Sequence, residues 1–309
     1  MKPMLSKNTN PYCPNNSQHN EHKNMKLIFH FTTLLMSASL ALAAERAKFP
    51  SWDGSETIAT YAQRAKLEPT LTLDLGGGVK LECVLAPAGS FVMGSPPGEA
   101  KTEQESAMER QHKVTITRPF YIGRLELTQA QYQKIMGDNP SLAKGDELPV
   151  HNVTWQNANE FCAKLSQQLK RDVQLPTEAQ WEYACRAGTT TTYYNGNDFA
   201  GLDKIAWFGA NSEHKMHPGG QKQANAWGIY DMLGNAREFV RDLFGTSPQG
   251  DAMDPTGPKD GDEKNHVVRG GAYTANAALA LNCRCAVHKP TEALAMNGFR
   301  IVVSVPEAR

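Results

Sequence analysis

Short apolar segments, separated by turn-forming residues, most constrain the fold of this chain. The 309 residues include 25 glycines and 18 prolines, a pattern that predicts a loop-rich α+β protein. The length suits one large domain or two modest ones. Lys and Arg (32) balance Asp and Glu (32), so no net field attracts nucleic acid or an anionic membrane surface. We therefore expect no nucleic-acid partner.

The N-terminal part has the pattern of an export signal. In residues 25–44, Lys26 is followed by a mostly apolar run and by the small-x-small site at 41–43. A transmembrane helix is the alternative, but the run is short, contains Ser and Thr, and ends in small residues. We expect a secreted or periplasmic protein with no stable membrane span after cleavage. Residues 1–24 are polar and are interpreted as a disordered leader or an extension of the gene model.

Export implies an oxidising compartment, where cysteines form disulfides. Five cysteines follow residue 44, and because five is odd, at least one is unpaired or pairs between chains. They are Cys83, Cys162, Cys185, Cys283 and Cys285.

Local patterns predict several elements of secondary structure. Residues 45–70 form an N-terminal extension or linker with a short helix over 56–65, which we expect to be packing only. Alternating apolar positions around Gly76–Gly78 indicate a hairpin, and the Glu-rich residues 94–112 indicate a surface loop. Two strands and a helix capped by Thr128 follow.

Two further helices have recognisable starts. One begins near Thr154 and carries an apolar face made by Ala158, Phe161, Cys162 and Leu165. The other has Thr177 at its N-cap and Gln180 three residues later, as in a capping box.

Seven phrases occur in a fixed order along the chain, and together they resemble the formylglycine-generating enzyme, or sulfatase-modifying factor, family. They are "PAGSFVMGS", "RPFYIGRLELTQAQYQKIMGDNPS", "LPVHNVTWQNANEFCAKLS", "QLPTEAQWEYACRAG", "NAWGIYDMLGNAREFVRD", "VVRGGAY" and "NGFRIV". The resemblance covers residues 71–304 and leaves 305–309 as a tail. It implies the C-type-lectin-like α+β fold of that family, with little regular secondary structure.

The resemblance also implies where catalytic groups should lie. The family's enzymes carry two copper-binding cysteines after Arg-Gly-Gly, and those places fall on Ala275 and Ala280 here. An active-site serine corresponds to Ala272 and an arginine to His288. Alanine supplies no thiolate and binds no soft metal, so we expect neither copper nor formylglycine formation. A shifted register, with Cys283 and Cys285 as the displaced pair, is the alternative.

Disulfide bonds follow from the same resemblance. The family's disulfide between the "WEYxC" helix and the segment after the catalytic pair corresponds to Cys185 and Cys285. A second family disulfide would join Cys162 to position 301, which is Ile301 here. We therefore expect Cys162 to be a buried free thiol. The pairing of Cys83 and Cys283 is left open: they form a disulfide with each other, or Cys283 is a surface thiol.

A structural calcium ion is implied at the loop "YDMLGNAREF". Its ligands would be the side chains of Asp231 and Glu238 and the carbonyls of Gly234 and Ala236, an all-oxygen set that suits a hard cation. Arg237 departs from the family's pattern and adds a positive charge beside the site.

Histidines outside these motifs are expected to be structural. His214 and His217 are interpreted as part of an exposed polar loop, because no third metal ligand accompanies them. His112 and His151 are interpreted as hydrogen-bonded structural groups.

Two classes of function remain after these motifs. The first is a catalytically silent binding or structural module for an unknown peptide, protein or small molecule. The second is an enzyme of altered chemistry, an oxidoreductase-type protein that uses a metal in the same cleft. In either case the expected cleft residues are Tyr273, Asn276, Leu279, Leu281, Cys283 and His288.

Overall fold

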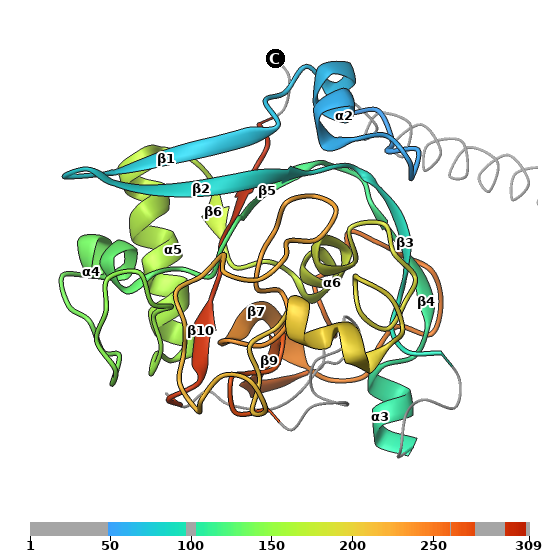
Figure 1. The fold of residues 1–309 in the computed structure, drawn as a ribbon. Coiled ribbons are helices and arrows are strands. Elements are labelled where there is room, and N and C mark those ends of the chain that lie inside the picture. The colour runs from blue at the N-terminus through green and yellow to red at the C-terminus, as the bar shows by residue number, and fades with distance from the viewer. Residues whose placement is uncertain (1–48, 97–102, 260, 276–293, 307–309) are drawn as a thin grey trace, which may run out of the picture. The chain divides into compact units, whose positions relative to one another are not determined.

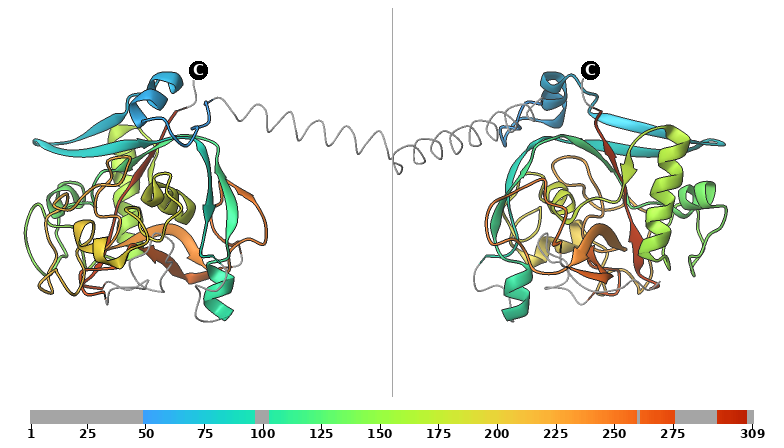
Figure 2. Two further views of the ribbon diagram at one scale, coloured as in Figure 1. Left: turned by 45° about the vertical axis from the view of Figure 1, so that its right-hand side comes forward. Right: turned by 180° about the vertical axis from the view of Figure 1, so that it is seen from behind.

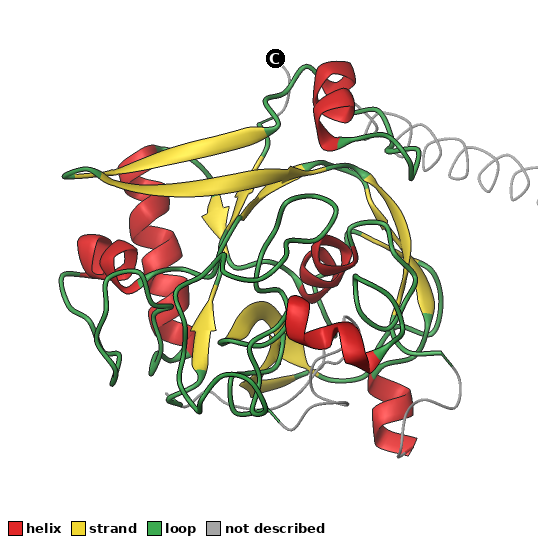
Figure 3. Cartoon of the chain, viewed as in Figure 1, coloured by secondary structure: helices red, strands yellow, loops and turns green. Residues whose placement is uncertain are grey.

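The computed structural model describes residues 49–96, 103–259, 261–275 and 294–306. The helices in these ranges are α2 (Ile58–Ala65), α3 (Glu103–Met108), α4 (Gln129–Met136), α5 (Trp155–Leu169), α6 (Glu178–Arg186) and the 3₁₀-helix η1 (Phe199–Lys204). The strands are β1 (Thr70–Gly76), β2 (Val79–Ala86), β3 (Gly89–Met93), β4 (His112–Ile116), β5 (Phe120–Gly123), β6 (Val173–Gln174), β7 (Arg237–Phe244), β8 (Ala252–Met253), β9 (Asp262–Arg269), β10 (Asn297–Phe299) and β11 (Val302–Ser304). Loops make up much of the remainder (Figure 3).

The largest sheet has the strand order β1-β2-β5-β11-β6. Strands β1 and β2 form the predicted hairpin, in which Leu73 pairs with Leu81, and Gly76–Gly78 all have the positive φ that their turn requires. Strand β11 comes from the far end of the sequence and lies between β5 and β6, antiparallel to both. The C-terminal part of the domain therefore supplies an inner strand of this sheet (Figure 1).

Each of the longer helices begins at a threonine that satisfies free backbone donors. Thr128, Thr154 and Thr177 accept a hydrogen bond from the third helical residue, whose side chain bonds back to the N-cap backbone. The three predicted helix starts are confirmed. Helix α5 also buries the predicted face of Ala158, Phe161, Cys162 and Leu165.

Two small sheets complete the domain, with the orders β3-β4-β8 and β10-β7-β9. Strands β2, β3 and β4 follow one another in an arc, and α6 lies inside that arc, as two views show (Figures 1 and 2). The surface loop predicted over 94–112 is wrong in part, because residues 103–108 form α3. That helix is too short for its sequence to show a 3.6-residue period.

The three cysteines in the described part of the chain lie in its interior. Cys83 and Cys162 are buried free thiols, so the prediction for Cys162 is confirmed. Burial raises the pKa of the Cys83 thiol to about 12 and also raises the pKa of Cys162. Cys185 is buried on α6, but its expected partner Cys285 lies outside the described residues, so that disulfide stays a prediction. Within the described ranges, no helix has the length and apolar character needed to cross a membrane.

Candidate functional site

Two glycines, directly after β9, bring the chain close to the loop that contains Gly234, just before the segment 272–275. Gly270 and Gly271 both have positive φ, and the carbonyl of Gly270 accepts a hydrogen bond of 2.7 Å from the amide of Gly234. A Cβ at position 270 would stand 3.2 Å from the carbonyl oxygen of Met232 and 3.3 Å from the Trp181 ring. Glycine is therefore required both by the backbone conformation and by this close approach.

The segment 272–275 is fixed by backbone hydrogen bonds. The amide of Tyr273 donates to the carbonyl of Asn235, and the carbonyl of Tyr273 accepts from the Ser212 hydroxyl at 2.7 Å. The carbonyl of Ala275 accepts from the amide of Gly209 at 3.1 Å. Ala272 is fully buried and Ala275 is 7 % exposed, so at both of these positions the structure has a packed methyl group.

The rest of the predicted cleft lies outside the described residues. This applies to Asn276, Leu279, Ala280, Leu281, Cys283, Cys285 and His288. The shifted register, with Cys283 and Cys285 as the displaced pair, therefore stays an untested alternative.

A cluster of polar and aromatic side chains borders the segment and was missed in the sequence. The His217 ring stacks on Trp207 with centroids 3.8 Å apart, and the Lys222 ammonium lies 3.8 Å from the centre of the same Trp207 ring. His217 Nε2 is 2.9 Å from the carbonyl oxygen of Ser212, which ties this cluster to Tyr273. Burial lowers the pKa of Lys222. His217 is thus half-buried, which corrects the expectation of an exposed polar loop, whereas His214 is exposed.

His112 and His151 fit the structural roles that were predicted for them. His151 Nε2 accepts hydrogen bonds from the amides of Leu142 and Ala143, and His112 Nδ1 lies 2.8 Å from the carbonyl oxygen of Arg110.

The expected calcium loop belongs to a buried cluster of charges. The Arg300 guanidinium donates to both oxygens of Glu238, at 2.6 and 2.7 Å. Trp181 Nε1 donates to the same Glu238 carboxylate at 2.7 Å. Glu126 accepts from the amide of Ala236 and from the side chain of Asn235, each at 2.7 Å. One arginine therefore faces more than one buried carboxylate.

The excess of buried negative charge accompanies raised pKa values at two of the carboxylic acids. Burial, with repulsion from Asp231 and Glu238, raises the pKa of Glu126 well above its ordinary value. Burial also raises the pKa of Asp231. Asp231 Oδ2 accepts from the amide of Gly220 at 2.7 Å, whereas Oδ1 is buried without a partner in the described part of the chain.

These residues fit a calcium ion only in part. The unpartnered Oδ1 of Asp231 is a suitable oxygen ligand, and a divalent cation would offset the charge excess. The Glu238 carboxylate does not fit, because Arg300 and Trp181 hold both of its oxygens. Across the described ranges, no group of three or more His, Cys, Asp or Glu side chains is arranged to hold a metal.

A second buried network lies at α6 and β9. Glu182 accepts from Arg186 at 2.8 Å and from Arg269 at 2.6 Å, and these two cations outweigh burial and lower the pKa of Glu182. Nearby, burial raises the pKa of Glu178 to about 7, and burial raises that of Asp242 to about 6. Asp242 Oδ2 accepts from the amide of Glu178 at 2.8 Å. The network holds the strand that leads into Gly270.

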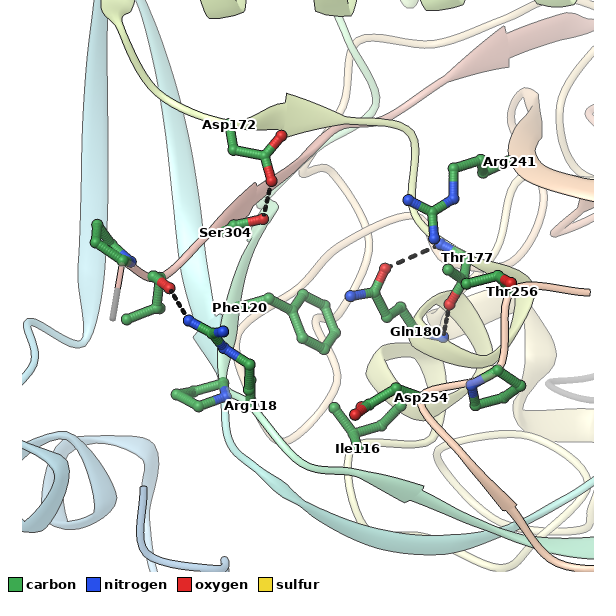
Figure 4. A pocket seen from close by; sticks show the side chains of 14 residues that line it. Ile116, Arg118, Phe120, Asp172, Thr177, Gln180, Arg241, Asp254, Thr256 and Ser304 are labelled. Atoms are coloured by element: carbon green, nitrogen blue, oxygen red, sulfur yellow. Dashed lines mark hydrogen bonds between the residues drawn. The ribbon is translucent and has the colours of Figure 1, made fainter. Parts of the chain in front are cut away.

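A cavity of ≈ 480 Å³ lies where the start of α6 meets the ends of β4 and β11. Its polar groups pair with one another (Figure 4): Asp172 accepts from Ser304 at 2.6 Å, and Gln180 accepts from the amide of Thr177 at 2.9 Å. Arg118 donates to the carbonyl of Val305 at 3.1 Å. The cavity therefore resembles a solvated junction between elements more than a site built for a ligand.

Comparisons with known proteins cover most of this domain. A family model described as "Sulfatase-modifying factor enzyme 1-like domain" matches residues 79–305. The "Chaperone protein LppX" of Paenibacillus barcinonensis is 32% identical over 192 residues, which are 46% of this chain and 68% of that protein. The "Formylglycine-generating enzyme" of Bos taurus is 25% identical over 322 residues, 81% of this chain and 83% of that protein.

Two further matches include a protein described as inactive and a solved structure. The "Inactive C-alpha-formylglycine-generating enzyme 2" of Bos taurus is 27% identical over 207 residues, covering 62% of each chain. The structure of "Treponema denticola variable protein 1" superposes with a TM-score of 0.70 at 26% identity, over 77% of this chain and 100% of that one. The fold that the sequence predicted is confirmed.

Proposed function

Because the chain belongs to the sulfatase-modifying factor enzyme 1-like family, we propose that it is a binding or structural member without formylglycine-generating activity. The observation that carries this proposal is the alanine at position 275, with a second at 280, where the resemblance places the copper-binding cysteines. Oxidation of a substrate thiol through copper needs a thiolate pair, and a methyl group neither binds copper nor transfers a proton.

The surroundings of Ala275 support the same reading. Its methyl group packs into the apolar core and its carbonyl is already bonded to Gly209, so little movement is available to bring another side chain into its place. The names of two relatives, a chaperone and an inactive enzyme, indicate that the family includes members that are not oxidases. The ligand proposed for the cleft is a peptide, a protein or a small molecule.

Activity towards a sulfatase-motif peptide tests this proposal. The purified protein is incubated with the peptide, copper and a reductant, and mass spectrometry follows conversion of the cysteine thiol to an aldehyde. The bovine formylglycine-generating enzyme is the positive control. We expect no aldehyde above the level of the enzyme-free reaction, and turnover by this chain would overturn the proposal.

The second candidate, an enzyme of altered chemistry, rests on the cluster of Trp207, His217 and Lys222 beside the segment. Burial lowers the pKa of Lys222, and its amine and the His217 imidazole both contact the Trp207 ring, so two side chains of the acid–base type border the segment. Metal analysis of the reduced and the oxidised protein separates the candidates. Stoichiometric copper or iron would favour the enzyme, and its absence in both preparations favours the binding module.

We also propose a structural calcium ion on Asp231 and the carbonyls of Gly234 and Ala236. Its support is the unpartnered Asp231 oxygen and the excess of buried carboxylates. Calcium that binds only the folded protein stabilises it by RT ln(1 + [L]/Kd), about 2.7 kcal/mol at one hundred times Kd. We expect the melting temperature to rise with calcium over an EDTA-treated sample. An unchanged melting temperature would remove the ion from the proposal.

Export is part of the same proposal and rests on residues 25–44. Fusion of residues 1–48 to a reporter that is active only outside the cytoplasm tests it. Activity that is lost when Lys26 and the apolar run are deleted supports export.

A further inference from the structure

A second cavity, of ≈ 540 Å³, lies between the N-terminal extension, β3 and the end of α6. We call it the Trp52 cavity, after the side chain that the extension contributes to its wall. None of its lining residues belongs to the segment 270–275 or to the loop 207–222 beside that segment. The volume lies within the range of small-molecule sites. Binding here goes beyond the proposed function and does not depend on whether the cleft of that function is catalytically silent.

Aromatic side chains form one wall of the Trp52 cavity. The amide of Trp52 donates to the carbonyl of Ala88 at 2.7 Å, and its indole Nε1 donates to the carbonyl of Glu56 at 2.9 Å. The Phe91 ring lies 5.1 Å from the buried ring of Tyr183. Trp52 and Phe91 are both partly exposed and line the cavity. A ligand would therefore meet aromatic surface that is already held in place.

The carboxylate of Asp53 lines the same cavity and is exposed to solvent. Its Oδ1 accepts from the amide of Ser55 at 2.8 Å, from the amide of Glu56 at 2.7 Å and from the Ser55 hydroxyl at 3.1 Å. These bonds orient the carboxylate, and those from the Glu56 and Ser55 amides lower the pKa of Asp53. No residue in the described ranges donates to Oδ2. One oxygen of an ionised, oriented carboxylate is therefore available to a ligand.

The cations near this carboxylate are already paired. Arg186 also lines the cavity, but only 4% of its side chain is exposed, and its guanidinium donates to Glu182 at 2.8 and 3.0 Å. Arg64 of α2 forms an ion pair with Glu56. The charge that the Trp52 cavity presents to a ligand is therefore negative, which favours a cation over an anion.

The hydrogen bonds of Asp53 also select the kind of cation. A guanidinium binds a carboxylate best through two parallel bonds, one to each oxygen, but Oδ1 of Asp53 already accepts three hydrogen bonds. An ammonium is a compact charge for which one oxygen is enough. Aromatic rings attract the same charge, and they pack against the alkyl chain that carries it.

We propose that the Trp52 cavity binds an aliphatic ammonium group, carried by a lysine side chain or by a free alkylamine. The ammonium donates to Oδ2 of Asp53, and its alkyl chain packs against Trp52 and Phe91. Asp53 is exposed, so its attraction for the ligand is that of a surface ion pair, and the affinity is modest and falls with added salt.

The test is a titration of the full protein with Nα-acetyl-lysine amide, followed by tryptophan fluorescence and by calorimetry. Nα-acetyl-norleucine amide lacks only the ammonium group, and Nα-acetyl-arginine amide replaces it by a guanidinium. We expect saturable binding of the lysine amide that weakens with salt, and binding of the other two amides weaker by about fivefold or more. n-Butylamine separates the two sources of the ligand: equal or tighter binding identifies a free amine, and weaker binding identifies a lysine side chain.

Variants locate the site. Asp53→Asn keeps an oxygen for the Ser55 and Glu56 amides and removes the charge, so it should keep the melting temperature and weaken lysine-amide binding about fivefold. Phe91→Leu removes the ring and should also weaken binding. The matched control, Asp74→Asn, changes an exposed carboxylate that accepts from the Gly76 amide at 2.8 Å, outside the cavity, and should leave binding unchanged.

Three outcomes overturn the proposal: no saturable binding of the lysine amide, equal or tighter binding of the norleucine or arginine amide, or binding that Asp53→Asn or Phe91→Leu leaves unchanged. The aldehyde assay of the proposed function is independent of these measurements, so failure of one inference is distinguishable from failure of the other.

Discussion

Replacing Arg300 by methionine tests the buried charge cluster most directly. Arg300 is fully buried, and its guanidinium donates to the Glu238 carboxylate and to the carbonyls of Gly123, at 2.9 Å, and Tyr230, at 3.1 Å. Methionine fills a similar volume but supplies neither charge nor donor. The variant would leave Glu238 buried beside Asp231 with no cation.

The expected size of the effect follows from that geometry. Removing one partner of a buried ion pair costs about 3–5 kcal/mol, because the other charge stays desolvated. For a domain of this size, each kcal/mol shifts the melting temperature by about 2–4 °C, so we expect a fall of about 6–20 °C. The comparison is made by calorimetry in EDTA at neutral pH, so that bound calcium does not mask the loss.

Two further variants make this prediction specific. Lys164→Met breaks an exposed pair with Glu160 and should cost only about 0.3–0.5 kcal/mol. Adding Glu238→Gln to Arg300→Met removes the stranded charge and should restore part of the stability. If Arg300→Met melts within about 2 °C of the wild type, the cluster does not carry the energy assigned to it.

Three other predictions follow from groups described above. The pKa of Glu178 is raised by burial from 4.5 to about 7, so the folded state holds a proton that the unfolded state has lost, and stability should fall as the pH rises from about 5 to 8. In urea unfolding, the stability of Glu178→Gln should fall with pH by less than that of the wild type, the difference being on the order of 2 kcal/mol. This value is smaller than the full pKa shift implies, because the Glu178 side chain is 18% exposed and solvent screens its charge. An equal pH dependence in both proteins would contradict the assignment. Gly234→Ala should reduce the yield of folded protein severely, because a Cβ would stand 2.2 Å from the Trp207 carbonyl oxygen, and circular dichroism with a normal melt would show otherwise. Cys83 and Cys162 should resist a thiol reagent in the native protein and react after unfolding, since both are buried with raised pKa values; mass spectrometry of a digest reads each site.

Local signals in the sequence were enough to predict those helices and turns whose formation depends on neighbouring residues. A threonine followed three residues later by Gln or Asn predicts a helix start, because both groups of the capping box lie within one turn. The glycines at 76–78 predict a tight hairpin for a similar reason, since glycine adopts positive φ without the steric cost that a side chain would add. The apolar face of α5, with Cys162 in it, follows from the helical period.

The site depends on pairs that are far apart in the sequence, and these were missed. Glu238 was expected to be a calcium ligand. Its ion pair with Arg300 could not be predicted from neighbouring residues, because Arg300 lies 62 residues later in the chain. The stack of His217 on Trp207 joins residues that are close in the sequence, but it lies within an irregular loop, which leaves no periodic pattern to predict it from. The segment after Gly271 was located through a family resemblance and not through local physics.

The place of β11 has a consequence for how the protein is made. Residues 302–304 are the strand that joins β5 to β6, so the largest sheet stays incomplete until nearly all of the domain has left the ribosome. Strands β1, β2 and β5 can pair with one another as they emerge, but β6 joins this sheet only through β11, so the sheet is completed late.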